Sequence, residues 1–321
     1  MTVAPSSDSG PPADPLARYG AAARAWIDST FLDLARQMRW SYLPPLMVYV
    51  AAGISGLTSI VGAFFVKEYL GLSAAFLASL GFWAGVPWTL KMPLGHLVDL
   101  IWRWKATLVY LGATLIASDV LIMYALITRP QQMATILDVN AWYVLAALLG
   151  PVGYVLQDVV ADAMTVEAVP TYDERGEPYA EATVKAMHTT MQTLGRIATI
   201  GGLVAVAAVN IFMFAGIEQL SQTEKADIYA TIYLAALVIP IVSVIGVTLG
   251  AIGLRRRIAA LRLQGVDAQR IAQLTAPEGE ATKVNWWIIG GGAAFVAFTL
   301  AVGLSDIPLN EEIIFVGSMA I

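Results

Sequence analysis

The stretch GVPWTLKMPLGHLVDLIWRWK, residues 85–105, decides the class of protein that this sequence encodes. It joins two long apolar runs and concentrates ionisable residues in a chain that consists mostly of hydrocarbon side chains. Charge of this density between two runs of bilayer length predicts a functional loop at the water interface of a membrane protein. The ionisable residues of the stretch are Lys91, His96, Asp99, Arg103 and Lys105.

The composition of the whole 321-residue chain supports the same interpretation. Hydrophobic residues make up 58% of the chain, charged residues make up 13%, and the mean hydropathy is +0.68. Soluble domains contain about 25% charged residues. The apolar residues occur in blocks of about 20, which as helices match the hydrocarbon thickness of a bilayer. The sequence therefore predicts an all-α integral membrane protein.

Charge and cysteine content restrict the kinds of ligand. The net charge is −5, and no Lys/Arg cluster is interleaved with aromatic residues, which argues against a nucleic-acid partner. The chain contains no cysteine, so disulfides, thiol catalysis and cysteine metal sites are excluded. His96 and His188 are too few and too isolated for a metal site. We therefore expect no metal and no cofactor.

Eight apolar runs follow one another along the chain. Seven are long enough to cross a bilayer, and the last, residues 313–321, is predicted to be the first half of an eighth span. Residues 1–14 are rich in Pro, Ser and Gly and predict disorder. Residues 16–40 fit an amphipathic helix at the membrane surface. The seven predicted spans are Leu43–Val66, Leu70–Leu90, Ala106–Thr128, Ala141–Ala161, Met191–Ala215, Ile228–Leu254 and Trp286–Leu304.

These runs divide the chain into four segments. We expect an N-terminal arm with the amphipathic helix over residues 1–42 and a six-helix transmembrane bundle over residues 43–254. A basic linker over residues 255–285 and the start of a second bundle over residues 286–321 follow. Six spans, a long linker and further spans are typical of transporters built from two related bundles. The short last run predicts a truncated second bundle, with a self-sufficient eight-helix protein as the alternative.

The distribution of Lys and Arg predicts a cytoplasmic N-terminus. Fifteen of the 19 basic residues fall on the side of the N-terminus, three fall on the other side, and Arg196 lies inside a span. The three are Lys67, Arg129 and Lys225. The fifteen are Arg18, Arg24, Arg36, Arg39, Lys91, Arg103, Lys105, Arg175, Lys185, Arg255, Arg256, Arg257, Arg262, Arg270 and Lys283.

Ionisable residues inside the predicted spans are the main candidates for a functional site, because a charge at the centre of a membrane helix costs about 2.5–3.5 kcal/mol. Asp119 lies near the middle of the third span. Asp158 and Asp162 are four residues apart in the fourth span, so they share one helix face. Arg196 lies at a similar depth in the fifth span, which predicts an Asp158–Arg196 ion pair. Such a pair would either fix helix register or line a cavity as a gate or proton-coupled pair.

Other polar and small residues add to this picture. Lys91 ends the second span and is expected either to extend to water or to bind an anion. Gln157 and Gln192 flank the charged positions and are candidates for hydrogen bonds to a substrate. Two Gly-x3-Gly patterns, at residues 81–85 and 246–250, predict close helix contacts.

The charged stretch also matches a known pattern. Gly95, Leu97, Asp99 and Arg103 fit Gly-x-Leu-x-Asp-x3-Arg, and here the sequence resembles the loop between helices 2 and 3 of the major facilitator superfamily. The resemblance implies a major-facilitator-like six-helix N-terminal bundle followed by the start of a second bundle. It also implies that this loop, including Lys105, acts as a cytoplasmic gate.

Three further stretches narrow the resemblance. FFVKEYLGLSAA (residues 64–75), VPWTLKMPLGHLVD (residues 86–99) and LQDVVADAMTVE (residues 156–167) resemble the folate-biopterin transporter family, and the resemblance covers roughly residues 43–208. Related peptidoglycan-fragment permeases share a comparable Lys-containing helix 2 and a Gln-Asp-x3-Asp segment. The resemblance implies a folate- or pterin-type substrate and coupling to protons.

The sequence thus predicts a secondary transporter, and not an enzyme, that moves a small organic solute by alternating access. The first alternative is a permease for peptidoglycan fragments or another organic solute. An alternative of another class is a non-transporting membrane assembly or sensor protein derived from a transporter. The expected partners are the solute, protons, membrane lipid, and either a second copy of the chain or a missing C-terminal half. The predicted site residues are Asp119, Asp158, Asp162, Arg196, Lys91, Gln157 and Gln192, with Gly95, Asp99, Arg103 and Lys105 in the gate loop.

Overall fold

A computed structural model of the protein describes residues 33–65, 70–173, 177–275, 283–303, 305 and 307–318. Within these residues all regular structure is helical, apart from an isolated bridge between Tyr172 and Pro178. Backbone contacts divide the chain into two compact units, residues 1–40 and residues 41–321. The predicted disordered segment and most of the predicted amphipathic helix lie outside the described residues.

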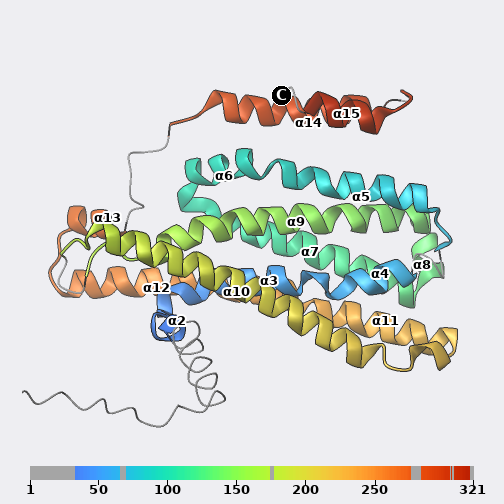
Figure 1. Ribbon diagram of the computed structural model, residues 1–321, viewed down its shortest axis with the longest axis horizontal. Helices are drawn as coiled ribbons and strands as arrows, with labels where there is room; N and C mark the ends of the chain where they lie inside the picture. Colours follow the sequence, from blue (N-terminus) through green and yellow to red (C-terminus); the bar gives the residue numbers. More distant parts are fainter. Residues whose placement is uncertain are drawn as a thin grey trace, which may run out of the picture. The chain divides into compact units, whose positions relative to one another are not determined.

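Helices follow one another along the whole described chain, joined by loops and short 3-10 turns (Figure 1). The first unit contributes α2, and the second unit contains all of the longer helices. The bounds are α2 Asp33–Arg36, α3 Leu43–Ile54, α4 Ser59–Phe65, α5 Ala74–Thr89, α6 Lys91–Leu100, α7 Lys105–Thr128, α8 Pro130–Ala134, α9 Val139–Ala168, α10 Glu181–Met213, α11 Gln222–Ala236, α12 Val238–Leu263, α13 Ala268–Thr275, α14 Trp286–Gly303 and α15 Asn310–Ser318.

Six helical segments of the described chain are long and apolar enough to cross a membrane. This confirms the prediction of an all-α integral membrane protein. Each segment overlaps a span that the apolar runs predict, because hydropathy over ~20 residues reports directly on bilayer thickness. The six are Trp40–Ala63, Trp102–Thr128, Val139–Ala168, Glu181–Gln219, Gln222–Leu263 and Trp286–Gly303.

The second predicted span, Leu70–Leu90, is absent from these six because its helix is shorter than expected. The helix α5 begins only at Ala74, where the Ser73 hydroxyl accepts a hydrogen bond from the backbone N–H of Phe76. It ends at Thr89, and α6 starts two residues later after a break at Leu90. Pro87 and Pro93 flank the break and cannot donate backbone hydrogen bonds, which favours an interruption here.

The helices α7 and α9 lie side by side at backbone-to-backbone distance (Figure 1). A Cβ atom on Gly153 would lie 2.6 Å from the carbonyl oxygen of Gly112, and a Cβ on Gly112 would lie 2.6 Å from that of Gly153. These two glycines therefore allow the approach. Gly53 and Gly202 play the same part between α3 and α10, where a Cβ on Gly202 would lie 2.8 Å from the Cα of Gly53.

The two predicted Gly-x3-Gly contacts have different outcomes. Gly246 and Gly250 of α12 both pack against Pro44 of α3, as predicted. The prediction for Gly81 and Gly85 of α5 is wrong, since a Cβ on either would meet no atom of the described residues within 4 Å. The pattern marks small helix surfaces, and only the packing decides which of them a neighbour covers.

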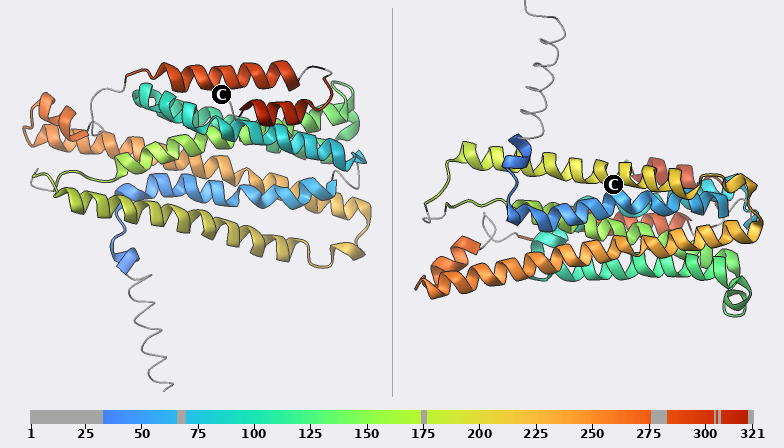
Figure 2. Two further views of the ribbon diagram at one scale, coloured as in Figure 1. Left: turned by 45° about the horizontal axis from the view of Figure 1, so that its top comes forward. Right: turned by 90° about the horizontal axis from the view of Figure 1, so that it is seen from below.

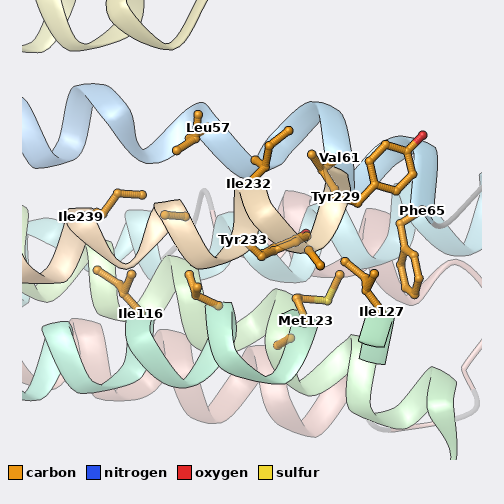
Figure 3. Close-up of a cluster of buried hydrophobic side chains, with 14 of the residues drawn as sticks. Leu57, Val61, Phe65, Ile116, Met123, Ile127, Tyr229, Ile232, Tyr233 and Ile239 are labelled. Carbon is orange, nitrogen blue, oxygen red and sulfur yellow. The ribbon is translucent and has the colours of Figure 1, made fainter. Parts of the chain in front are cut away.

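The largest core cluster lies among α4, α7, α11 and the start of α12 (Figure 3). Tyr229, Ile232 and Tyr233 of α11 are almost completely buried there. They pack with Val61 of α4 and Met123 of α7, among others. This cluster packs α11 against the centre of the bundle. Because Ile239 of α12 belongs to the same cluster, the residues on both sides of the turn between α11 and α12 are packed in the core.

The helix α14 packs against α6 and, at its last residue Gly303, against Trp83 of α5 (Figure 2). A Cβ on Gly292 would meet the ring of Pro93 at 2.7 Å, and the backbone N–H of Asn285 donates to Nε2 of His96 over 2.8 Å. The predicted half span, residues 313–321, corresponds to α15, which begins earlier, at Asn310. It folds back on α14, with Gly317 against the ring of Phe298.

Candidate functional site

Four polar side chains from α3, α6 and α9 form one connected network inside the bundle. Lys91 Nζ lies 2.6 Å from Asp158 Oδ2 and 3.0 Å from Asp162 Oδ2. The hydroxyl of Tyr49 donates to the second oxygen of the same aspartate, Asp162 Oδ1, over 2.6 Å. The network therefore ties three helices together through charge-assisted hydrogen bonds. We refer to these four residues, Tyr49, Lys91, Asp158 and Asp162, as the ion network.

Local sequence explains how each charge reaches the network. Lys91 is the first residue of α6, directly after the break at Leu90, so the break places its side chain beside α9. Asp158 and Asp162 are one turn apart on α9 and present two carboxylates to the same lysine. The resulting network holds one cation and two anions.

The ion network runs from the interior toward an open surface. The Asp158 side chain is 16% exposed, whereas those of Lys91 and Asp162 are 43% and 49% exposed. Lys91 and Asp162 therefore lie at the surface of the described chain, and they cover most of Asp158. Gly195 of α10 packs against the ring of Tyr49, so this ring is held from the opposite side.

The predicted Asp158–Arg196 ion pair is wrong. Asp158 pairs with Lys91, and no ion pair joins it to Arg196, although both residues are described. Gly195 faces Tyr49, and the next residue of an α-helix points about 100° away from it. Arg196 is consequently exposed, as is Gln192 one turn earlier on α10.

Both polar atoms of the Gln157 side-chain amide form hydrogen bonds to neighbouring helices. Its Oε1 accepts from the hydroxyl of Ser243 on α12 over 2.8 Å, and its Nε2 donates to the carbonyl oxygen of Val109 on α7 over 3.4 Å. The residue is 3% exposed. The structure therefore places Gln157 at the junction of α7, α9 and α12, one residue before Asp158.

Asp119 lies in a separate region, on α7 where it faces α9. A Cβ on Gly150 would lie 2.5 Å from Asp119 Oδ2, so this glycine makes room for the carboxylate. Three tyrosines, Tyr143, Tyr154 and Tyr233, are close enough to interact electrostatically with it. No lysine or arginine of the described part of the chain forms an ion pair with it.

The gate-loop residues are divided between two environments. Lys105 Nζ lies 2.9 Å from Glu167 Oε2 and 3.6 Å from the centre of the Trp102 ring, so its charge is held at the start of α7. Asp99 and Arg103 are exposed, and neither forms an ion pair with another described residue. Gly95 lies in α6 beside Val159 of α9.

Sequence reasoning did not identify Tyr49 or Glu167 as members of the site. Tyr49 lies in an apolar span that contains no charge to draw attention to it, and 113 residues separate it from Asp162. Glu167 could have been suspected, because it is an acid near the end of a span that needs a counter-ion.

These observations define a multi-pass α-helical membrane protein with a partly exposed ion network among its helices. Over 62 residues the chain is 37% identical to a folate-biopterin transporter of Synechocystis sp., and the match covers 19% of this chain and 13% of that protein. The match therefore spans much less than two thirds of the relative. No family model matches the chain, and no solved structure matches it. The comparison points to a transporter-like protein.

Proposed function

We propose that this protein is a proton-coupled secondary transporter of a folate- or pterin-type solute that works by alternating access. The observation that carries the proposal is the ion network of Tyr49, Lys91, Asp158 and Asp162 inside a membrane bundle. Ionisable groups within membrane-spanning helices, such as Asp158 and Asp162 of α9, are costly and mark substrate or ion pathways. The similarity to a folate-biopterin transporter supports the substrate class.

The charges of the network suit the exchange of a proton or an anion. Two carboxylates share one ammonium group, so uptake of one proton by a carboxylate balances the charges. A carboxylate of a folate-type solute can replace Asp162 at the exposed side of Lys91, while Asp162 then accepts the proton. Gln192, exposed on α10, supplies hydrogen bonds for the solute in this proposal, and Arg196, which points away from the ion network, supplies a further cation on the outer side of α10.

The remaining residues act on access and coupling in this proposal. Asp119, which faces Gly150 of α9 and has no basic partner among the described residues, is a second proton-binding group. Asp99 and Arg103 form the gate on the cytoplasmic side, where the N-terminus also lies. Lys105 is fixed by Glu167 and Trp102 and anchors the gate to the bundle.

Uptake of radiolabelled folate into proteoliposomes tests the proposal. An imposed pH gradient is expected to drive uptake, and a muropeptide fragment serves as the competing solute. Asp158→Asn should lower the initial rate at least tenfold, because it removes the buried carboxylate that holds Lys91. Arg129→Gln, which removes an exposed charge outside the network, is the matched control and should leave uptake unchanged. Absence of gradient-driven uptake in the unaltered protein would contradict the proposal.

A further inference from the structure

Four arginines lie on the C-terminal part of α12. This part of α12 extends past the first residue of the neighbouring helix α7. The helices α7 and α12 are in contact and run in opposite directions, and the hydroxyls of Tyr110 and Thr248 lie 3.3 Å apart between them. At about 1.5 Å per residue, Arg255 lies about 10 Å beyond Thr248. Trp104 lies about 9 Å beyond Tyr110 in the same direction. We call Arg255, Arg256, Arg257 and Arg262 the arginine collar.

The arginine collar carries positive charge without a counter-ion from the described chain. All four side chains are exposed, and no described carboxylate forms an ion pair with any of them. Arg255, Arg256 and Arg257 occupy successive positions about 100° apart, so they cover more than half of the circumference of the helix. Guanidinium groups bind phosphate through two parallel hydrogen bonds.

The surface next to the collar is apolar on one side. Ile252 and Leu254, directly before the first arginine, are 39% and 36% exposed, as expected for side chains that contact lipid tails. Trp104 is 72% exposed at the depth of the collar, where aromatic side chains favour the headgroup region of a bilayer. Along α12, exposed apolar side chains are followed directly by arginines. A phospholipid has the same order along its length, because its apolar tails are followed by the phosphate of the headgroup.

We propose that the arginine collar binds the headgroups of anionic phospholipids and so anchors this end of α12 in one leaflet. The partner is a lipid because the arginines continue a lipid-facing surface, and it is anionic because the collar has no described counter-charge. The inference does not depend on the proposed transport activity.

Binding of phosphatidylglycerol to the purified full chain tests the proposal, with phosphatidylcholine as the neutral comparison. Each bound molecule is counted by native mass spectrometry during lipid titration. Arg255→Gln/Arg257→Gln should weaken phosphatidylglycerol binding on the order of twentyfold, because each basic residue near the surface contributes about fivefold in affinity. The control Arg129→Gln/Lys185→Gln also removes two exposed positive charges and should change the affinity less than twofold.

Three outcomes would overturn the proposal. Equal weakening by the two double variants would show that net charge alone attracts the lipid. Equal affinity for phosphatidylglycerol and phosphatidylcholine would remove the anionic headgroup as the ligand. Displacement of the lipid by inorganic phosphate at an equal concentration would show an anion site that does not require the apolar surface.

Discussion

Lys91 is shared by two carboxylates of α9, so the ion network holds two anions for one cation. In this network, the ammonium group has three N–H donors and contacts Asp158 at 2.6 Å and Asp162 at 3.0 Å at the same time. The half-exposed position of Lys91 leaves part of this ammonium group uncovered by the described chain.

A double-mutant cycle at Lys91 and Asp158 measures how strongly the two groups stabilise the protein. Lys91→Gln is expected to lower the free energy of unfolding by about 1–2 kcal/mol, because Asp158 loses its counter-ion while solvent screens the half-exposed lysine. Adding Asp158→Asn should recover about 1 kcal/mol. Unfolding in mixed micelles followed by tryptophan fluorescence gives the four values. Strictly additive effects would show that the pair contributes nothing to stability.

The composition of this network could be predicted only in part from the sequence. Lys91, Asp158 and Asp162 were recognised because each is a charge within or beside a predicted span. Depth along a helix follows from residue number, but rotation around the helix axis does not. For this reason Arg196 was expected opposite Asp158, although Gly195 is the residue of α10 that faces the network.

Among the helices, α7 and α9 approach each other closely, and the site depends on this contact. Gln157, Asp158 and Asp162 all belong to α9, and Asp119 belongs to α7. The glycines at 112 and 153 allow the two backbones to meet, so the network and Asp119 are held in one packed pair of helices. The sequence does not reveal this, because neither glycine belongs to a Gly-x3-Gly pattern.

Substitution of Gly153 by Ala is expected to lower the free energy of unfolding by about 2–3 kcal/mol. The added methyl group would meet the backbone of Gly112, which cannot move aside as a flexible side chain would. Gly201→Ala in α10 is the matched control, because no described atom lies within 4 Å of its Cβ. The control should be neutral or stabilise the helix by up to about 1 kcal/mol. Similar unfolding curves for the two variants would refute the importance of this contact.

For the whole molecule, the distribution of basic residues sets the orientation in the membrane. The arginine collar and Lys105 lie at one end of the bundle, and Arg129 follows α7 at the other end. Hydropathy was sufficient to predict the order and approximate bounds of the membrane helices. It was not sufficient for the break at Leu90, which depends on the positions of two prolines.

Labelling of single cysteines tests the predicted orientation without removal of any native thiol, since the chain contains none. Leu263→Cys lies at the end of α12, where the native side chain is 90% exposed, and Ile136→Cys replaces a side chain that is 75% exposed beyond α8. An impermeant maleimide added to intact cells should label position 136 only. Position 263 should react after permeabilisation. The reverse pattern would show that the N-terminus lies outside.

The break at Leu90 gives α14 a mechanical connection to the ion network. The short α6 carries Lys91 at its first residue, and the same helix is bonded to α14 through His96 and packed against it at Pro93. The two prolines interrupt the rigid connection to α5, so α6 can follow a displacement of α14 more readily than a continuous helix would. An antibody fragment that binds α14 is thus expected to restrict the movement of α6 and of Lys91 without contacting the ion network itself.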